Sequence, residues 1–201
     1  MFALVESGSI TKHLNGNKGI QIGDLKYPRA IYTLWTEAER NAIGIYEIVY
    51  DDTNKKDERW FINTNQSYAF ANSTVTATYG TATAKAHADA NFTEEDEDNG
   101  LGTEGELKSR GLKYHLIQAV KQQAAVELAN TDWYITRNAE KSTAIPSAIT
   151  THRDLVRSRQ ATMETQITNA SNTPALETLY TYTKDSDGVT SRPLAEIPTL
   201  D

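Results

Sequence analysis

Apolar and polar residues alternate over short runs in the first 91 residues of the chain. Runs of Val, Ile, Thr, Tyr and Phe are separated by Gly, Asn, Asp and Pro, a pattern typical of short β-strands joined by turns. Asn15-Gly16 and Asn17-Lys18-Gly19 have the residue types of tight turns. We predict strands at 2–5, 19–22, 31–34, 44–50, 60–63, 66–70 and 74–83.

One short helix is expected to interrupt these strands. Thr36 and Glu39 have the spacing of a capping box, in which each side chain accepts a hydrogen bond from a free backbone N–H at the start of a helix. Gly44 has the residue type that ends a helix. The pattern predicts a helix over 37–42.

The apolar period changes from two to about 3.6 residues after residue 106, which indicates a change from strands to helices. Leu112, Leu116, Val120, Ala124 and Leu128 are spaced by four and would share one face of a helix. We therefore predict a helix from about 104 to 130.

The β-branched and aromatic residues at 131–136 break this period, so we predict a connector over 131–144. Pro146 then suits the first turn of a second helix. Every seventh position along that helix is apolar, which predicts one buried seam. The seam residues are Ile149, Val156, Met163 and Ala170.

A last short helix is predicted after Thr173, which would cap it ahead of Pro174. Residues 185–188 form a predicted turn, and 192–200 form a predicted extended tail.

Between the two halves, residues 92–106 contain five consecutive acids followed by Asn99-Gly100-Leu101-Gly102, which predicts a linker. We thus expect an α+β fold with a β-rich subdomain at 1–91, an acidic linker at 92–106 and a helical subdomain with an extended tail at 107–201.

Composition excludes several kinds of chemistry. The 201 residues include no Cys, so a disulfide framework, a thiolate metal site and a cysteine nucleophile are ruled out. The net charge of −7 arises from seven acids at 93–106, while the other 20 acids balance 20 bases. General electrostatic capture of nucleic acid is therefore not expected. No apolar stretch reaches the ~20 residues of a membrane helix, and the N-terminus lacks the basic start of an export signal, so we expect neither membrane insertion nor Sec-type export.

The candidate catalytic and metal-binding residues do not form a recognisable motif. His13, His87, His115 and His152 are dispersed and lack the paired spacing of a helical metal site. The chain has no nucleophile elbow, no P-loop and no dinucleotide-binding glycine motif. We predict that the protein is not an enzyme and holds no cofactor.

A calcium-loop spacing occurs in the acidic segment. Glu95, Glu97, Asn99, Gly100 and Glu106 fall at positions 1, 3, 5, 6 and 12 of the template. Position 1 is normally Asp, and position 8 is Gly102 where an apolar residue is expected. A solvated linker, or a docking strip for a basic partner, fits these residues better, and we predict no metal site.

Two places are candidate protein interfaces. The 74–83 run has small side chains and no charge, which predicts a sheet edge covered by another chain. The alternative is that this run pairs on both sides within the N-terminal sheet, which would leave no edge for a partner. Trp133, between two helices, is predicted to fill the space between them, or to be an interface residue if it is exposed. The aromatic residues of the β-rich half are predicted mainly as core, with a carbohydrate-binding or partner-binding surface as the alternative. The candidate interface residues are Thr74, Thr76, Thr78, Tyr79, Thr83 and Trp133.

Several segments resemble structural proteins of tailed bacteriophages, including tail fibre and tail fibre assembly proteins. They are the opening MFALVESG (1–8), LWTEAERNAIGIYE (34–47), QQAA (122–125), TDWYITR (131–137), AIP (144–146) and the closing RPL (192–194). The stretch from Asp132-Trp133-Tyr134 to Ile145-Pro146 is the most specific and is similar to a helical hairpin that ends tail-associated chains.

The resemblance implies a role in virion assembly and transfers no catalytic residue. It predicts a small tail, baseplate or fibre-attachment component that is made in the host cytoplasm, is retained in the virion tail and is present in several copies. Its expected partners are other tail or fibre proteins. An assembly chaperone that leaves the particle and a receptor-binding module remain as alternatives.

Overall fold

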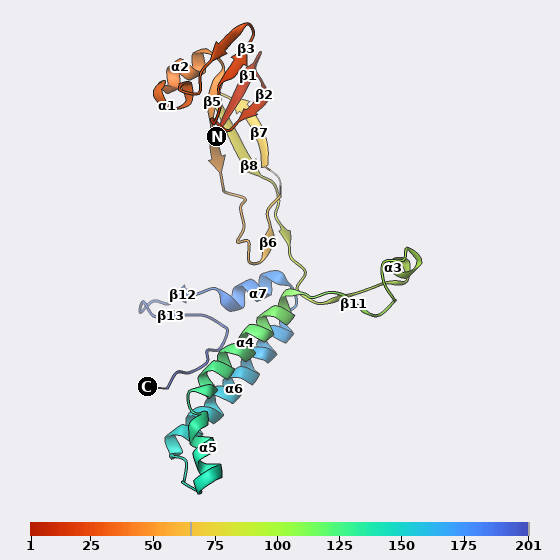
Figure 1. Ribbon diagram of the computed structural model, residues 1–201, viewed down its shortest axis with the longest axis vertical. Helices are drawn as coiled ribbons and strands as arrows, with labels where there is room; N and C mark the ends of the chain where they lie inside the picture. Colours follow the sequence, from red (N-terminus) through yellow and green to blue (C-terminus); the bar gives the residue numbers. More distant parts are fainter. Residues whose placement is uncertain (65, 201) are drawn as a thin grey trace. The chain divides into compact units, whose positions relative to one another are not determined.

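The computed structural model describes residues 1–64 and 66–200. Its contacts divide the chain into two compact units, Met1–Thr83 and Ala84–Asp201. Strands dominate the first unit and helices the second, which confirms the predicted α+β class (Figure 1). The boundary between the units lies ahead of the predicted boundary at residue 91.

The first unit is built on a five-stranded mixed sheet with the order β2-β1-β5-β8-β7. Only β5 and β8 run parallel, and the other neighbours are antiparallel. The sheet curls into a half-barrel, which brings its two outer strands close together. The rings of His13 on β2 and Tyr68 on β7 lie 4.2 Å apart between centroids. Its strands are β1 (Phe2–Glu6), β2 (Ser9–Leu14), β5 (Ile45–Asp51), β7 (Gln66–Ala71) and β8 (Thr74–Tyr79).

Both faces of β1 are buried, which accounts for its unbroken apolar run. Ala3 and Val5 point into one cluster with Ile48 of β5 and Val75 of β8. Leu4 points to the opposite face and packs in a second cluster, because successive side chains of a strand alternate in direction. The second cluster is completed by Ile20, Ile31, Tyr32 and Ile45.

Two short helices and a small hairpin supply the rest of this unit. The hairpin pairs β3 (Ile20–Ile22) with β4 (Leu25–Tyr27). The helix α2 (Glu37–Ala42) is the one predicted, and its capping box is present: Glu39 N–H donates to Thr36 Oγ1 at 3.3 Å, while Thr36 N–H donates to the Glu39 carboxylate at 2.7 Å.

The predicted strand at 31–34 is wrong, since this segment forms the single-turn helix α1 (Ile31–Leu34). A strand would send Ile31 and Tyr32 to opposite faces. In the helix both are buried in the same cluster, with Trp35 packed against it. Burial of neighbouring large side chains on one side therefore outweighs the strand preference of β-branched residues.

Helices dominate the second unit. The long helices are α4 (Leu112–Ala129) and α6 (Ser147–Asn169), joined by α5 (Asp132–Lys141), and α7 (Thr173–Tyr180) follows. Four two-residue strands complete the described elements outside the acidic segment: β6 (Phe61–Ile62) in the first unit, β9 (Thr83–Ala84) across the boundary, and β12 (Thr183–Lys184) with β13 (Thr190–Ser191) in a hairpin.

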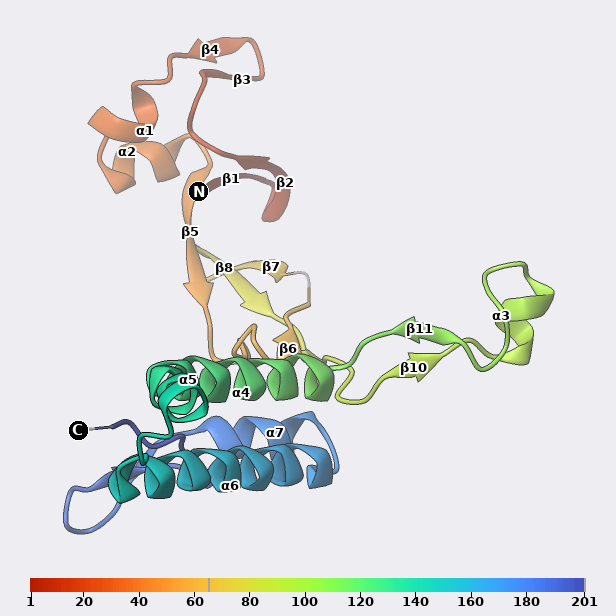
Figure 2. The same ribbon diagram turned by 60° about the horizontal axis from the view of Figure 1, so that its bottom comes forward.

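The helices α4 and α6 pack antiparallel along their whole length (Figure 2). At one end Lys113 Nζ donates to the Thr168 carbonyl at 2.8 Å, and at the other the Arg153 guanidinium donates to the Leu128 carbonyl at 2.8 Å. Val120 and Ala124 are buried on α4. All four predicted seam residues of the second helix, Ile149, Val156, Met163 and Ala170, are buried as well.

The predicted connector at 131–144 is wrong, because most of it is α5. Arg153 of α6 donates to the buried Thr131 hydroxyl at 2.6 Å and pairs with Asp132 at 2.9 Å, which fixes the turn at which α5 begins. Ser142, in the left-handed conformation with φ 52°, ends the helix. These tertiary contacts override the low helix preference of residues 131–136.

Two helix starts also differ from the prediction. The helix α4 begins at Leu112 rather than near 104, because 107–109 form a strand and Gly111 lies against the Ala88 backbone, where a Cβ would approach within 2.2 Å. The cap of α7 is Asn172, whose side chain accepts from Ala175 N–H at 2.9 Å. Thr173 instead donates its hydroxyl hydrogen bond to the Lys85 carbonyl at 2.6 Å.

Gly44 is expected to be the glycine of the first unit that tolerates substitution least. It has φ +81°, and a Cβ there would lie 2.6 Å from the Val5 carbonyl oxygen. Gly8 has a similar φ of +77° but nothing within 4 Å, so Gly8→Ala is the matched control for left-handed strain alone. We expect Gly8→Ala to lower the free energy of unfolding by about 1–2 kcal/mol and Gly44→Ala by about 1–3 kcal/mol more. Equal losses in urea denaturation would contradict the close packing of β1 on this turn.

Candidate interaction surfaces

The strand β8 is an inner strand of the sheet, so the predicted sheet edge at 74–83 is wrong for residues 74–79, and the alternative of pairing on both sides within the sheet is confirmed for them. Its backbone pairs with β5 on one side and with β7 on the other. Val75 and Ala77 are fully buried. The Thr- and Ala-rich sequence reflects limited room inside the curled sheet, where the larger Tyr46, Tyr68 and Phe70 pack against the same cluster.

Four of the predicted interface residues, Thr74, Thr76, Thr78 and Tyr79, lie on β8, whose backbone is paired on both sides and therefore has no free strand edge. Thr74 is exposed and Thr76, Thr78 and Tyr79 are half-buried, while Thr83 is exposed on β9. Contacts through their side chains stay a prediction. The outer strands of the sheet are β2 and β7, which the sequence pattern did not single out.

Trp133 is exposed, so its predicted place in the space between the helices is wrong. It lies on α5 with 51% of its surface accessible. Its ring stacks on that of Tyr134 at 3.8 Å between centroids, and the guanidinium of Arg137 lies over both rings, at 4.6 Å and 5.3 Å. We call Trp133, Tyr134 and Arg137 the α5 aromatic patch.

The α5 aromatic patch consists of the residue types that dominate binding energy at protein interfaces. Stacking holds the three side chains in one arrangement, which lowers the entropy lost when a partner binds. Tyr134 and Arg137 were not among the predicted site residues, although Trp133 and Arg137 have the i, i+4 spacing that brings side chains together on a helix.

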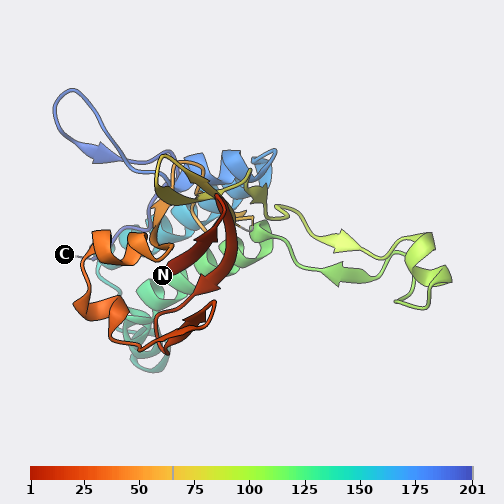
Figure 3. The same ribbon diagram turned by 90° about the horizontal axis from the view of Figure 1, so that it is seen from above.

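The predicted acidic linker is an ordered hairpin within the second unit. The strands β10 (Ala90–Asn91) and β11 (Leu107–Ser109) pair antiparallel, and the helix α3 (Glu94–Asp98) forms the tip. Residues 90–109, the acidic arm, extend away from the helices (Figures 2 and 3). The helix starts at a second capping box, Thr93 with Asp96, whose threonine-to-acid spacing was visible in the sequence.

Local bonds hold the tip of the acidic arm. Lys108 Nζ donates to Asp96 at 2.7 Å, and Glu104 N–H donates to Glu97 at 2.9 Å. The hydrogen bond from Lys108, assisted by the N–H of Thr93, lowers the pKa of the Asp96 carboxyl. Since the pKa is lower in the folded state, this contribution to stability is present above the unfolded pKa and is lost as the pH falls through the folded one.

The base of the acidic arm is fixed to the start of α4. Asp89 accepts a hydrogen bond from Gly111 N–H at 2.8 Å and pairs with Arg110. The Gly111 hydrogen bond, with that of Arg110, lowers the pKa of the Asp89 carboxyl. Beyond this base, the exposed residues include six carboxylates and two leucines: Glu94, Glu95, Glu97, Asp98, Glu104, Glu106, Leu101 and Leu107.

The calcium-template residues lie in the arm but do not converge on one point. Asn99 donates its side-chain amide to the Glu95 carbonyl at 2.8 Å, and Glu97 accepts from the Glu104 backbone. Over residues 1–64 and 66–200, no group of three His, Asp or Glu side chains is placed to hold a metal ion.

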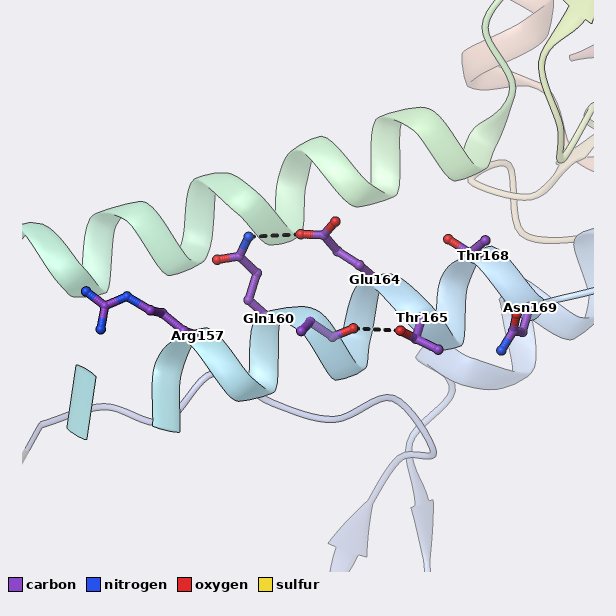
Figure 4. Close-up of a pocket in the computed structure, with 7 residues that line it drawn as sticks. Arg157, Gln160, Glu164, Thr165, Thr168 and Asn169 are labelled. Carbon is purple, nitrogen blue, oxygen red and sulfur yellow. Dashed lines mark hydrogen bonds between the residues drawn. The ribbon is translucent and has the colours of Figure 1, made fainter. Parts of the chain in front are cut away.

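A surface cavity runs along α6 and has a volume of about 590 Å³ (Figure 4). It is an open polar groove rather than an enclosed site. Gln160 donates to Glu164 at 2.9 Å and Thr165 donates to the Ala161 carbonyl at 2.9 Å, so these polar groups already bond one another. Glu164 also faces Lys121 of α4 at 3.7 Å.

The buried His152 pairs with Glu127 of α4 at 2.9 Å. The same Glu127 oxygen accepts from Leu200 N–H at 3.0 Å. The His152–Glu127 pair thus joins α4, α6 and the end of the extended tail, so its role is structural.

In the part of the chain that the structure describes, no helix combines the length and apolar character needed to span a bilayer.

Comparison with known proteins gives no further assignment: no family model, no curated protein and no solved structure matches the chain. The physical features of the acidic arm and the α5 aromatic patch therefore carry the functional argument.

Exposure of Trp133 leads to a stability prediction. We expect Trp133→Ala to change the free energy of unfolding by less than about 1 kcal/mol, because the side chain loses only surface stacking. Met163→Ala, at a seam position that is 1% exposed, should cost about 2–5 kcal/mol. Both are measured by urea denaturation, and a loss above about 3 kcal/mol for Trp133→Ala would show that the indole is buried in solution.

Proposed function

We propose that the chain is a non-enzymatic structural component of a tailed-bacteriophage virion, in the tail, the baseplate or the fibre attachment. It acts through protein–protein contacts and is present in several copies. The resemblance of its segments to phage tail proteins motivates the choice of particle, and the acidic arm is the observation that supports an assembly role.

The arm is held by hydrogen bonds and an ion pair at its surface and has no buried residue in its tip helix. Its strand ladder consists of the pairs Ala90–Ser109 and Asn91–Leu107, and its tip helix has five residues, none of them buried. Isolated two-stranded hairpins and single-turn helices are marginally stable in water. Six exposed carboxylates add mutual repulsion. A partner surface would relieve both weaknesses.

The chemistry of the arm indicates the kind of partner. Exposed carboxylates fit a surface rich in Lys and Arg, and Leu101, 62% exposed at the tip, fits a small apolar depression in such a surface. The α5 aromatic patch offers a second contact. The proposed partners are therefore other tail or fibre proteins, and the proposed location is the virion tail after synthesis in the host cytoplasm.

Neutralising the arm tests this function. The variant Glu94→Gln, Glu95→Gln, Glu97→Gln, Asp98→Asn is expected to fold but to enter particles at least tenfold less, because it loses four charges that meet the partner. The matched control neutralises four exposed acids elsewhere: Asp24→Asn, Asp52→Asn, Glu140→Gln and Asp187→Asn. Quantitative mass spectrometry of purified particles measures incorporation, and circular dichroism checks the fold.

The same measurement separates the alternatives. Equal incorporation of both variants would contradict the role of the arm. Absence of the wild-type chain from purified particles would favour an assembly chaperone that leaves. Binding of the isolated chain to host-surface glycan would instead favour a receptor-binding module.

A further inference from the structure

The extended segment Arg192–Leu200 is held on the helices of the second unit mainly by side chains. Leu194 is 1% exposed, although no helix or strand surrounds it in sequence. Its N–H donates to the Leu179 carbonyl of α7 at 3.0 Å. This residue is the apolar anchor of the segment.

A single glutamine of α6, Gln166, forms hydrogen bonds with the backbone on both sides of Leu194. Gln166 Nε2 donates to the Pro193 carbonyl at 2.9 Å, and Gln166 Oε1 accepts from Ala195 N–H at 3.0 Å. A side-chain amide that bonds both groups imitates a neighbouring strand and requires an extended segment. Gln166 thus recognises conformation, while the buried site for Leu194 recognises the side chain.

The flanking residues add two further contacts. The guanidinium of Arg192 lies over the rings of Tyr180 and Tyr182, at 5.6 Å and 5.0 Å. Glu196 accepts from the Tyr182 hydroxyl at 2.7 Å and faces Arg192 Nε at 3.3 Å. Each residue from 192 to 196 therefore makes a distinct contact, as in the recognition of a short linear motif.

The connection between this segment and α7 is long and weakly held. Residues 181–191 are all exposed. Tyr182 contacts Arg192 and Glu196, and the rest is tied by a ladder of two residue pairs, Thr183–Ser191 and Lys184–Thr190. Once that ladder opens, the nine residues 183–191 reach about 30 Å, which exceeds the ~10 Å spacing of packed helices.

We propose that residues 192–196 (RPLAE) are a transferable motif, that α6, α7 and the following Tyr182 form its receptor, and that a second copy of this chain supplies the motif when copies are close together. In the proposed exchange, the motif of one copy makes the same contacts in the receptor of another copy as it makes in its own. The exchange therefore loses only the β12–β13 ladder and the advantage of a motif tethered to its own receptor. A short tether gives an effective concentration on the order of millimolar. Dilute chains therefore keep their own segment, and crowded copies exchange it.

Peptide binding in trans tests the receptor. The open receptor is the full chain with residues 192–196 replaced by Gly and Ser, with full-length Leu194→Asp as a second version. The probe is a fluorescent peptide of residues 190–200. We expect saturable binding by anisotropy, weakened at least tenfold by Gln166→Ala in the receptor or by Leu194→Asp in the peptide, and at least tenfold weaker in the wild-type chain.

A mixing experiment tests exchange between copies. The open receptor lacks the motif, and a full chain with Gln166→Ala keeps the motif but has a damaged receptor. Native mass spectrometry should detect a heterodimer in the mixture and monomers of each alone. In the wild-type chain, millimolar peptide should also remove the hydrogen-exchange protection of the Ala195 amide, a measurement that needs no folded variant.

Three results would overturn the proposal. The first is peptide binding that Gln166→Ala leaves unchanged. The second is peptide binding with no heterodimer in the mixture, which would exclude exchange between copies. The third is full protection of Ala195 in the wild-type chain at millimolar peptide.

Discussion

The pairing of α4 with α6 is the contact on which the second unit depends. Its apolar part is narrow: Val120 and Ala124 on one helix and Val156, Met163 and Ile167 on the other are the fully buried residues of the pair. Polar contacts at both ends supplement it, through Lys113 at one end and through Glu127 with His152 at the other. Because the contacts of the pair extend from Lys113 to Leu128 of α4, the pair gives a rigid base to short elements that have no core of their own.

Three such elements are attached to this helix pair. Arg153 links the turn before α5 to α6, which presents the α5 aromatic patch. Asp89 and Gly111 fix the acidic arm at the start of α4. Gln166 holds the extended segment around Leu194. The unit thus combines a narrow core with long displayed segments, which is the arrangement that the proposed assembly role requires.

The sequence predicted the features that depend on local patterns. The Thr36 capping box and the seven-residue spacing of Ile149, Val156 and Met163 act within a few turns of chain, and both are present in the structure. The second capping box, at Thr93, was missed because the run of acids and the glycines after it were interpreted as a linker.

The misplaced elements depend on contacts between residues distant in sequence. The start of α5 is set by Arg153, about twenty residues later, so the β-branched run at 131–136 misled the prediction. The inner position of β8 depends on its parallel pairing with β5. Trp133 was expected to fill the space between two helices because it lies between them in the sequence, and only the placement of α5 shows it to be exposed.

A comparison of amide hydrogen exchange in the isolated chain and in the assembled particle tests most directly whether the acidic arm binds a partner. Amides with few buried contacts exchange through local opening, so those of residues 90–109 should exchange quickly in the isolated chain. In purified particles the same amides should be protected, while those of α4 and α6 should be protected in both samples. Equally slow exchange of the arm in the isolated chain and in the particle would contradict the account, as would equally fast exchange in both.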